Sequence, residues 1–295
     1  SLRGGPERAR SLQWTEILAR LRGERLDLGP RTEVGGGRIY ALMRGLRGRP
    51  GRARKFDHLH NFAASGWGCD SLLDTRRAQV PALLELIERA PERWRHGVVV
   101  IRIGVNDFGQ PAALQRLAQD ADDPQTQGAI SACLAAIERS VERLHARLPT
   151  LQIVLVGIFD NRHLPGQHAR WQSEGESTRV VRALDRFDQG LRALSAQRPQ
   201  LFFLDERALF ARLFGDRDAQ GRPHYRPLRI GDFELRLSQG DTPEHFLLQD
   251  GHGGTLWNAL WLNALLALLG EAPLKAEEML GLIGGVNPDT TSPRS

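Results

Sequence analysis

Two short segments, far apart in this chain, carry residue types that could perform hydrolysis with a serine nucleophile. Gly104-Val105-Asn106-Asp107 follows an apolar run, and Asp250-Gly251-His252 precedes an apolar helix. The nucleophile itself would have to be Ser1. A serine hydroxyl is a weak nucleophile at neutral pH, so a histidine must accept its proton during attack, and His252 would be that base.

The apolar run before Asn106 predicts a buried strand. Residues 98–103 are compact and rich in β-branched side chains, which is typical of a parallel strand covered on both faces. Such a strand delivers the Gly-Val-Asn-Asp turn to its carboxyl end. Ligands bind at that end in open α/β sheets, so the turn is a candidate part of a site.

Helical and strand patterns alternate along the chain. After the strand at residues 98–103, the pattern predicts a helix over residues 129–148, a strand over 151–157, a helix over 177–196 and a strand over 201–204. This βαβ order indicates a doubly wound parallel sheet. We expect one domain over residues 1–272, with a hairpin inserted near 215–244 and a tail over 273–295.

One connection is longer than usual. Residues 160–177 form a polar stretch that carries His163, His168 and Trp171, and it follows the predicted strand over residues 151–157. Lids and substrate loops occur at such places.

Composition predicts a soluble globular protein. The chain has 295 residues, of which 41% are hydrophobic, enough for the core of a large α/β domain. No apolar run approaches the roughly 18 residues of a membrane span, because Asn258 and Asn263 interrupt the most apolar stretch. We therefore expect no integral membrane segment.

The net charge of +5 does not predict a nucleic-acid partner, because the basic residues are interspersed with acids on helices, which is typical of solvated faces. The densest basic stretch, from Arg44 to Lys55, contains glycines and a proline and predicts an exposed loop. Cys69 and Cys133 could form one bridge, although their spacing does not demand it. A Cys/His metal site is not predicted.

Three ordered blocks resemble those of the SGNH, or GDSL-type, esterase and lipase family. Asn61-Phe62-Ala63-Ala64-Ser65-Gly66 is similar to its Asn-x-x-x-Ser-Gly segment, Gly104-Val105-Asn106-Asp107 to its Gly-x-Asn-Asp turn, and Asp250-Gly251-His252 to its Asp-x-x-His pair. Ser1-Leu2 resembles the second half of Gly-Asp-Ser-Leu. The resemblance implies a three-layer α/β/α fold with a central, mostly parallel, flavodoxin-like sheet, whose first strand would precede Ser1 and be missing here.

The resemblance also implies roles for individual residues. Ser1 would be the nucleophile, His252 the base and Asp250 the residue that orients its imidazole, while Gly66 and Asn106 would stabilise the oxyanion. For substrate binding the expected residues are Trp67, Asp107 and Phe108. Only one residue separates Asp250 from His252, where the family has two, so Asp241 is an alternative orienting residue and His245 an alternative base.

The function that follows from this resemblance is a serine esterase that works through an acyl-enzyme without metal or cofactor. Lipid, aryl and acetylated carbohydrate esters all fit as substrates. A non-catalytic SGNH-like binding module is the alternative, and a nucleotide-binding protein ranks last because no Gly-x-Gly-x-x-Gly turn follows a strand. The acyl and alcohol groups, the oligomeric state and the compartment stay open, and export is compatible with the sequence.

Overall fold

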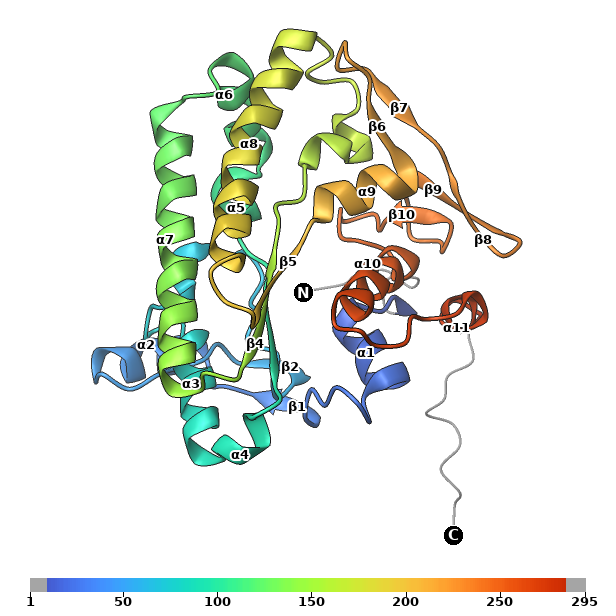
Figure 1. The fold of residues 1–295 in the computed structure, drawn as a ribbon. Coiled ribbons are helices and arrows are strands. Elements are labelled where there is room, and N and C mark those ends of the chain that lie inside the picture. The colour runs from blue at the N-terminus through green and yellow to red at the C-terminus, as the bar shows by residue number, and fades with distance from the viewer. Residues whose placement is uncertain (1–9, 285–295) are drawn as a thin grey trace. The chain divides into compact units, whose positions relative to one another are not determined.

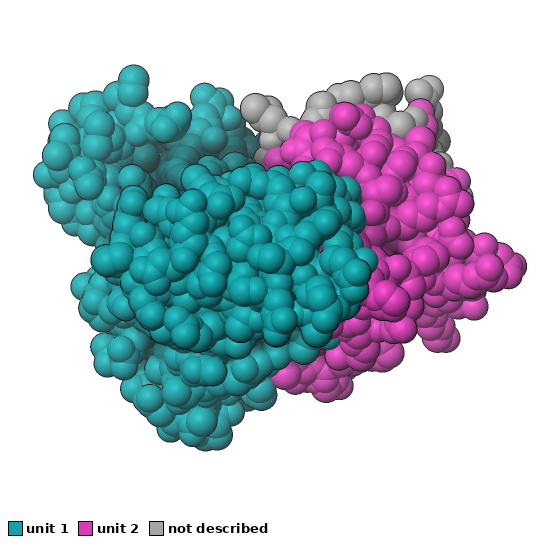
Figure 2. Space-filling model, turned by 90° about the horizontal axis from the view of Figure 1, so that it is seen from above, with its two compact units in different colours: residues 1, 28–210, 217–223 teal, residues 2–27, 211–216, 224–295 magenta. Residues whose placement is uncertain are grey.

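The computed structural model describes residues 10–284. Within these residues the chain divides into two compact units, coloured teal and magenta in Figure 2. Unit 1 contains Leu28–Phe210 and Arg217–Pro223, and unit 2 contains residues 10–27, Ala211–Asp216 and residues 224–284. The single domain over residues 1–272 stays a prediction.

Unit 1 contains a parallel sheet of three strands. The strands are β3 (Val98–Ile101), β4 (Gln152–Val156) and β5 (Leu201–Leu204), with β4 in the middle. Val98 pairs with Gln152, and Ile153 pairs with Leu201. The predicted strands are thus confirmed, and so is the βαβ order that connects them.

Two long helices run side by side along one face of this sheet (Figure 1). They are α7 (Pro124–Arg147) and α8 (Glu174–Ser195). Each begins at a side-chain cap, since Asp123 accepts a hydrogen bond from the Thr126 N–H and Ser173 accepts one from the Glu176 N–H. Their buried side chains recur every three or four residues, as a core-facing stripe requires: Ile130, Cys133, Ile137, Val141 and Leu144 in α7, and Val180, Leu184, Phe187 and Leu191 in α8.

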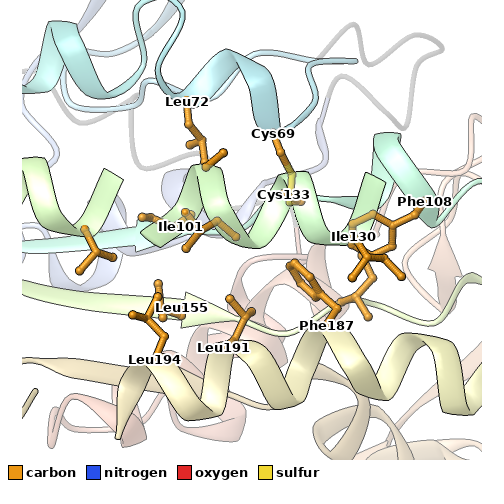
Figure 3. Packing of buried hydrophobic residues seen from close by; sticks show 14 of the residues in the cluster. Cys69, Leu72, Ile101, Phe108, Ile130, Cys133, Leu155, Phe187, Leu191 and Leu194 are labelled. Carbon is orange, nitrogen blue, oxygen red and sulfur yellow. A yellow bond between two sulfur atoms is a disulfide. The ribbon is translucent and has the colours of Figure 1, made fainter. Parts of the chain in front are cut away.

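A disulfide joins α7 to the short 3₁₀ helix η2 (Cys69–Leu72). Cys69 and Cys133 are both buried within the hydrophobic core, with Ile101 and Leu72 among their neighbours in Figure 3. The sequence had allowed this disulfide without requiring it. The remaining helices of this region are α3 (Val80–Arg89), α4 (Pro91–Trp94), α5 (Val105–Phe108) and α6 (Pro111–Gln119).

The segment before Gly66 contains one strand and one helix that the sequence did not predict, besides a strand from Lys55 that it did. β1 (Arg31–Val34) pairs antiparallel with β2 (Lys55–His58), and α2 (Arg38–Leu46) lies between them in the sequence. The exposed loop predicted from Arg44 to Lys55 is therefore wrong at its start, because Arg44 to Leu46 belong to α2. Gly45 does not break α2, because it provides room for the Arg76 side chain, whose Cγ would clash with a Cβ at this position.

The long connection after β4 is packed into unit 1. It forms two short 3₁₀ helices, η3 (Asn161–His163) and η4 (Pro165–Gln167), and Asp160 and Arg162 are each only 1% exposed. Burial by itself raises the pKa of Asp160, but the charges of Arg162 and His163, together with the hydrogen bonds from Arg162, outweigh it and hold that pKa below its ordinary value. Asn161 also donates a hydrogen bond of 2.8 Å to the Gly109 carbonyl. The first residues of the predicted lid or substrate loop, 160–163, are thus buried and hydrogen-bonded.

Unit 2 is built around α1 (Trp14–Arg22) and α10 (Thr255–Leu268), whose Trp14 and Trp261 rings lie 5.0 Å apart. The predicted hairpin is confirmed as β8 (Leu228–Ile230) and β9 (Phe233–Gln239), and β10 (His245–Leu247) pairs parallel with β9. A short helix, α11 (Ala276–Gly281), was not predicted. The remaining elements are α9 (Glu206–Phe214), β6 (Gly215–Arg217) and β7 (Pro223–Tyr225). None of the helices described in residues 10–284 has the length and apolar character needed to cross a membrane.

The disulfide closes a large loop, and its removal should lower stability. Cys69 and Cys133 are 64 residues apart, so the chain-entropy model predicts a loss of about 4 kcal/mol in the free energy of unfolding for the double variant C69A/C133A. Chemical denaturation with and without a reductant measures this. The reductant should destabilise the wild type and leave the variant unchanged, and an equal midpoint for the wild type under both conditions would contradict the prediction.

Candidate functional site

The turn after β3 presents Asn106 to solvent and turns Asp107 inward. Gly104 has a φ of +111°, and a Cβ there would lie 2.9 Å from Phe108 Cζ, so glycine is required both for the backbone and for the close packing. α5 starts directly afterwards. Within it, Asn106 is exposed, Asp107 is partly buried and Phe108 is fully buried.

Asn106 contacts the segment that follows Gly66. Its Nδ2 donates a hydrogen bond of 3.0 Å to the Trp67 carbonyl. Gly66 itself is exposed and has a φ of +75°. The structure therefore brings the two predicted oxyanion residues, 40 positions apart in the sequence, into adjacent segments of unit 1.

Gln110 fixes the orientation of the Asn106 amide. Its Nε2 donates to Asn106 Oδ1 and to the Val105 carbonyl, each at 3.3 Å. Because Asn106 Oδ1 accepts one hydrogen bond while its Nδ2 donates another, the two ends of the amide are distinguished. Gln110 was not predicted as a site residue, although its position four residues after Asn106 could have indicated a contact between the two side chains.

Asp107 binds the protein's own backbone. Its Oδ1 and Oδ2 lie 3.2 and 3.1 Å from the Cys69 nitrogen, whose N–H they accept. A Cβ at Gly68 would clash with Asp107 Oδ1, so the carboxylate needs a glycine beside it. Burial raises the pKa of Asp107, although the Cys69 hydrogen bond acts in the opposite direction. This geometry supports a structural role rather than the predicted substrate contact.

The two predicted aromatic residues differ in position. Phe108 is 0% exposed, and its ring centroid lies 4.9 Å from that of Phe187 in the core (Figure 3). This corrects the expectation that Phe108 contacts substrate, because its fully buried ring packs in the core. Trp67 is partly exposed, and it follows Gly66 directly.

Two basic side chains hold the loop that leads to Gly66. Arg52 Nη1 donates a hydrogen bond of 3.0 Å to the Leu59 carbonyl, and its guanidinium lies 4.1 Å from the centroid of the Phe62 ring. Burial lowers the pKa of Arg52 to about 10, which leaves it cationic at neutral pH. Lys55 Nζ donates to the Ala63 carbonyl. Arg52 and Lys55 therefore stabilise the loop. The sequence did not predict this role, because the glycine-rich stretch around them indicated only an exposed loop.

In unit 2, Asp250 and His252 contact each other directly. Asp250 Oδ2 lies 3.0 Å from His252 Nδ1, and Asp250 Oδ1 accepts a hydrogen bond of 3.2 Å from the His252 N–H. The intervening Gly251 has a φ of +83°, a conformation that lets the short loop turn back on itself. The single-residue spacing therefore does not prevent the contact.

The two alternatives have other partners in unit 2. Asp241 Oδ1 accepts a hydrogen bond of 2.9 Å from the Gln249 N–H, and His245 Nδ1 lies 2.8 Å from Ser238 Oγ. The His252 side chain is 53% exposed, so its ring is accessible. Ser1 lies outside the described residues.

One cluster has the composition of a metal site. Ligand-type atoms of Cys69, Cys133 and Asp107 lie within 4.8 Å of one another. The two sulfur atoms are bonded to each other as a disulfide, and thiolates are the form in which cysteine binds metals. We therefore assign this cluster a structural role.

Comparison with protein families identifies the class of protein. Residues 31–225, more than half of the chain, match the GDSL-like Lipase/Acylhydrolase family, and the chain belongs to this family. The resemblance seen in the sequence blocks is thus confirmed. Membership implies the SGNH α/β hydrolase fold and indicates a hydrolase of the esterase and lipase type. No curated protein matches the chain.

The raised pKa of Asp107 predicts a pH dependence of stability. In the folded protein the pKa of Asp107 lies above its ordinary value of 3.8, so the folded state binds this proton more tightly than the unfolded state. The free energy of unfolding therefore falls as pH rises above 3.8 and the carboxyl group ionises. We expect the free energy of unfolding of the wild type, relative to Asp107→Asn, to fall between pH 3.8 and neutral pH. Chemical denaturation at several pH values measures this difference.

Asp122→Asn is a control for which the opposite pH dependence of stability is expected. The hydrogen bond from Arg186 lowers the pKa of Asp122, so the wild type should gain stability relative to this variant as pH rises. A flat profile for Asp107→Asn beside a rising one for Asp122→Asn would contradict the assigned burial of Asp107.

Proposed function

We propose that this chain is a serine esterase that hydrolyses carboxylic esters through an acyl-enzyme. The observation that carries this proposal is the 3.0 Å contact between Asp250 Oδ2 and His252 Nδ1, in a chain that belongs to the lipase and acylhydrolase family. An aspartate on Nδ1 selects the tautomer whose Nε2 can accept a proton. The exposed His252 ring can therefore act as a base.

In the proposed reaction, the Ser1 oxygen attacks the acyl carbon of the ester while His252 Nε2 takes the serine proton. The carbonyl oxygen becomes an oxyanion in the tetrahedral intermediate. His252 then gives the proton to the leaving alcohol, which leaves the acyl group on Ser1. Water repeats the sequence: it attacks the acyl carbon, His252 takes its proton and returns it to the serine, and the carboxylic acid is released.

The oxyanion would be stabilised by the Gly66 N–H and the Asn106 side chain. The Nδ2 group of Asn106 carries two hydrogens, and one hydrogen bond to Trp67 uses only one of them. Gln110 holds the amide so that this nitrogen keeps its orientation. A donor fixed before reaction stabilises the transition state without reorganisation, which supports this role.

Trp67 is the proposed substrate contact, since its ring is partly exposed next to Gly66. Lipid, aryl and acetylated carbohydrate esters are the proposed substrates. For the fold, we propose the three-layer, flavodoxin-like arrangement of the family. It is supported by the parallel order β3-β4-β5 with α7 and α8 on one face.

His252 and Asp250 are tested by substitution. His252→Ala and Asp250→Asn should each lower kcat for a short-chain p-nitrophenyl ester by about 10⁴-fold, because the base is either removed or held in the wrong tautomer. His245→Ala is the matched control, and it should retain activity. Loss of activity in His245→Ala with activity retained in His252→Ala would move the base to His245.

A serine-reactive phosphonate tests the nucleophile by a second readout. It should label Ser1, as located by mass spectrometry, and Ser1→Ala should abolish both labelling and turnover. Folded protein that binds an ester without labelling or turnover would overturn the esterase in favour of a binding module.

Asn106 and Gln110 should have graded effects. Asn106→Ala should lower kcat by about 10²–10³-fold, the loss typical of one oxyanion donor. Gln110→Leu should lower kcat by about tenfold at unchanged KM, because the amide remains but is less well oriented. Gln127→Leu is the control, since it removes a comparable side-chain hydrogen bond, to the Ala121 carbonyl. Equal kcat values for Gln110→Leu and Gln127→Leu would refute the positioning role.

A further inference from the structure

Helix α2 exposes large apolar side chains that the rest of unit 1 does not cover. Within residues 10–284, the exposed large hydrophobic side chains fall on α2 and β2 alone: Ile39 (76%), Leu46 (75%), Phe56 (66%), Tyr40 (55%), Met43 (47%) and Leu42 (45%). Large apolar patches on a protein surface mark sites of interaction with proteins or membranes.

The apolar residues of α2 form a stripe that faces the solvent. Ile39, Leu42, Met43 and Leu46 follow the spacing i, i+3, i+4, i+7, which in most helices defines the side turned to the core. Here the inward side consists of small residues instead. Ala41 is the buried residue of α2, and Gly45 packs against Arg76. The helix is thus attached by its small residues and presents its large ones outward.

The charges of the chain segment that carries this stripe have one sign. From Arg38 to Lys55 the chain has seven basic residues and no acidic residue. Arg52 and Lys55 hold the loop before Gly66, and Arg54 pairs with Glu33. The other four, which are Arg38, Arg44, Arg47 and Arg49, have no carboxylate partner in the part of the chain that the structure describes.

We propose that α2 docks this protein on an anionic lipid surface, with its apolar stripe inserted between headgroups and its arginines paired with lipid phosphates. The surface formed by Ile39, Leu42, Met43, Leu46 and the four arginines is named the α2 face. An apolar helix face flanked by basic residues is the arrangement that lies in a membrane interface. Each arginine near an anionic surface strengthens binding about fivefold.

Charge complementarity favours this occupant over a second copy of the chain. A two-fold dimer through the α2 face would bring the same four arginines of each copy together, and like charges in an interface oppose association. Anionic headgroups neutralise these charges instead. The α2 face is a docking surface beyond the proposed function, and it does not depend on esterase activity.

The test measures binding to vesicles by co-sedimentation. Vesicles of phosphatidylcholine with one quarter phosphatidylglycerol should bind the protein, and vesicles of phosphatidylcholine alone should bind it at least about tenfold more weakly. Added salt should weaken binding to the anionic vesicles. Equal binding to the two compositions, or no binding to either, would overturn the proposal.

Two pairs of substitutions test the α2 face itself. Ile39→Ser with Leu46→Ser removes the exposed apolar ends of the stripe and should lower vesicle binding by about 100-fold. Arg47→Gln with Arg49→Gln should lower it by about 30-fold. The matched control is Arg139→Gln with Arg143→Gln, which removes the same charge from the exposed face of α7 and should have little effect. An equal loss in both arginine pairs would overturn the assignment to α2.

Two further readouts distinguish lipid docking from misfolding and from dimerisation. Hydrolysis of a soluble ester and the thermal midpoint should be unchanged in the α2 variants, because the substituted side chains are exposed and Ala41 and Gly45 are retained. Suppose that sedimentation velocity shows a wild-type dimer, that Ile39→Ser with Leu46→Ser abolishes this dimer, and that the protein does not bind vesicles. This result would overturn the proposal in favour of a second copy of the chain. Vesicle binding requires no turnover, so loss of esterase activity alone leaves this inference standing.

Discussion

The hydrogen bond between the Asp107 carboxylate and the Cys69 N–H fixes two distant segments of unit 1 to each other. One segment contains Gly66 and the other contains Asn106. The Cys69–Cys133 disulfide then ties the first segment to α7, while β3 positions the second. Both oxygens of the carboxyl group accept the same N–H, so one side chain links segments that are 38 residues apart in the sequence.

Charged pairs stabilise the segments that follow the carboxyl ends of the strands. After β4, Asp160 pairs with the buried Arg162. Asp188 of α8, paired with Arg207, accepts a hydrogen bond of 2.9 Å from the Ile158 N–H. Buried charges are costly unless they are paired and hydrogen-bonded, so such pairs impose one conformation on the chain. The result is a rigid sheet edge, which a site that must hold hydrogen-bond donors in place requires.

Helix α2 is the feature of unit 1 that is hardest to explain by folding alone. Packing the large residues of α2 inward would bury apolar area and stabilise the fold, yet its small residues face inward instead. The two basic residues that hold the loop before Gly66, Arg52 and Lys55, lie in the connection that follows α2 and at the start of β2. One short stretch of chain therefore carries both the exposed apolar residues of α2 and the two basic residues that support the backbone of the loop.

The sequence by itself determined the elements with a strong period and the motifs that follow them. The β-branched run at β3, the stripes of α7 and α8, the hairpin of β8 and β9, and the family blocks containing Gly66 and Asn106 were all readable, because each depends on residues close together in the chain. Tertiary structure alone decided the rest. It turned Phe108 into the core, gave Asp107 to the Cys69 backbone and closed the disulfide.

It also formed α2 over the start of a glycine-rich basic stretch, since the contact of Gly45 with Arg76 outweighs weak local propensity there. The contact between Asp250 and His252 is local, but it too depends on backbone conformation, since the left-handed Gly251 lies between them where the Asp250 carboxylate is 3.0 Å from His252 Nδ1. Local patterns thus set which elements form, whereas contacts between distant residues set what each side chain touches.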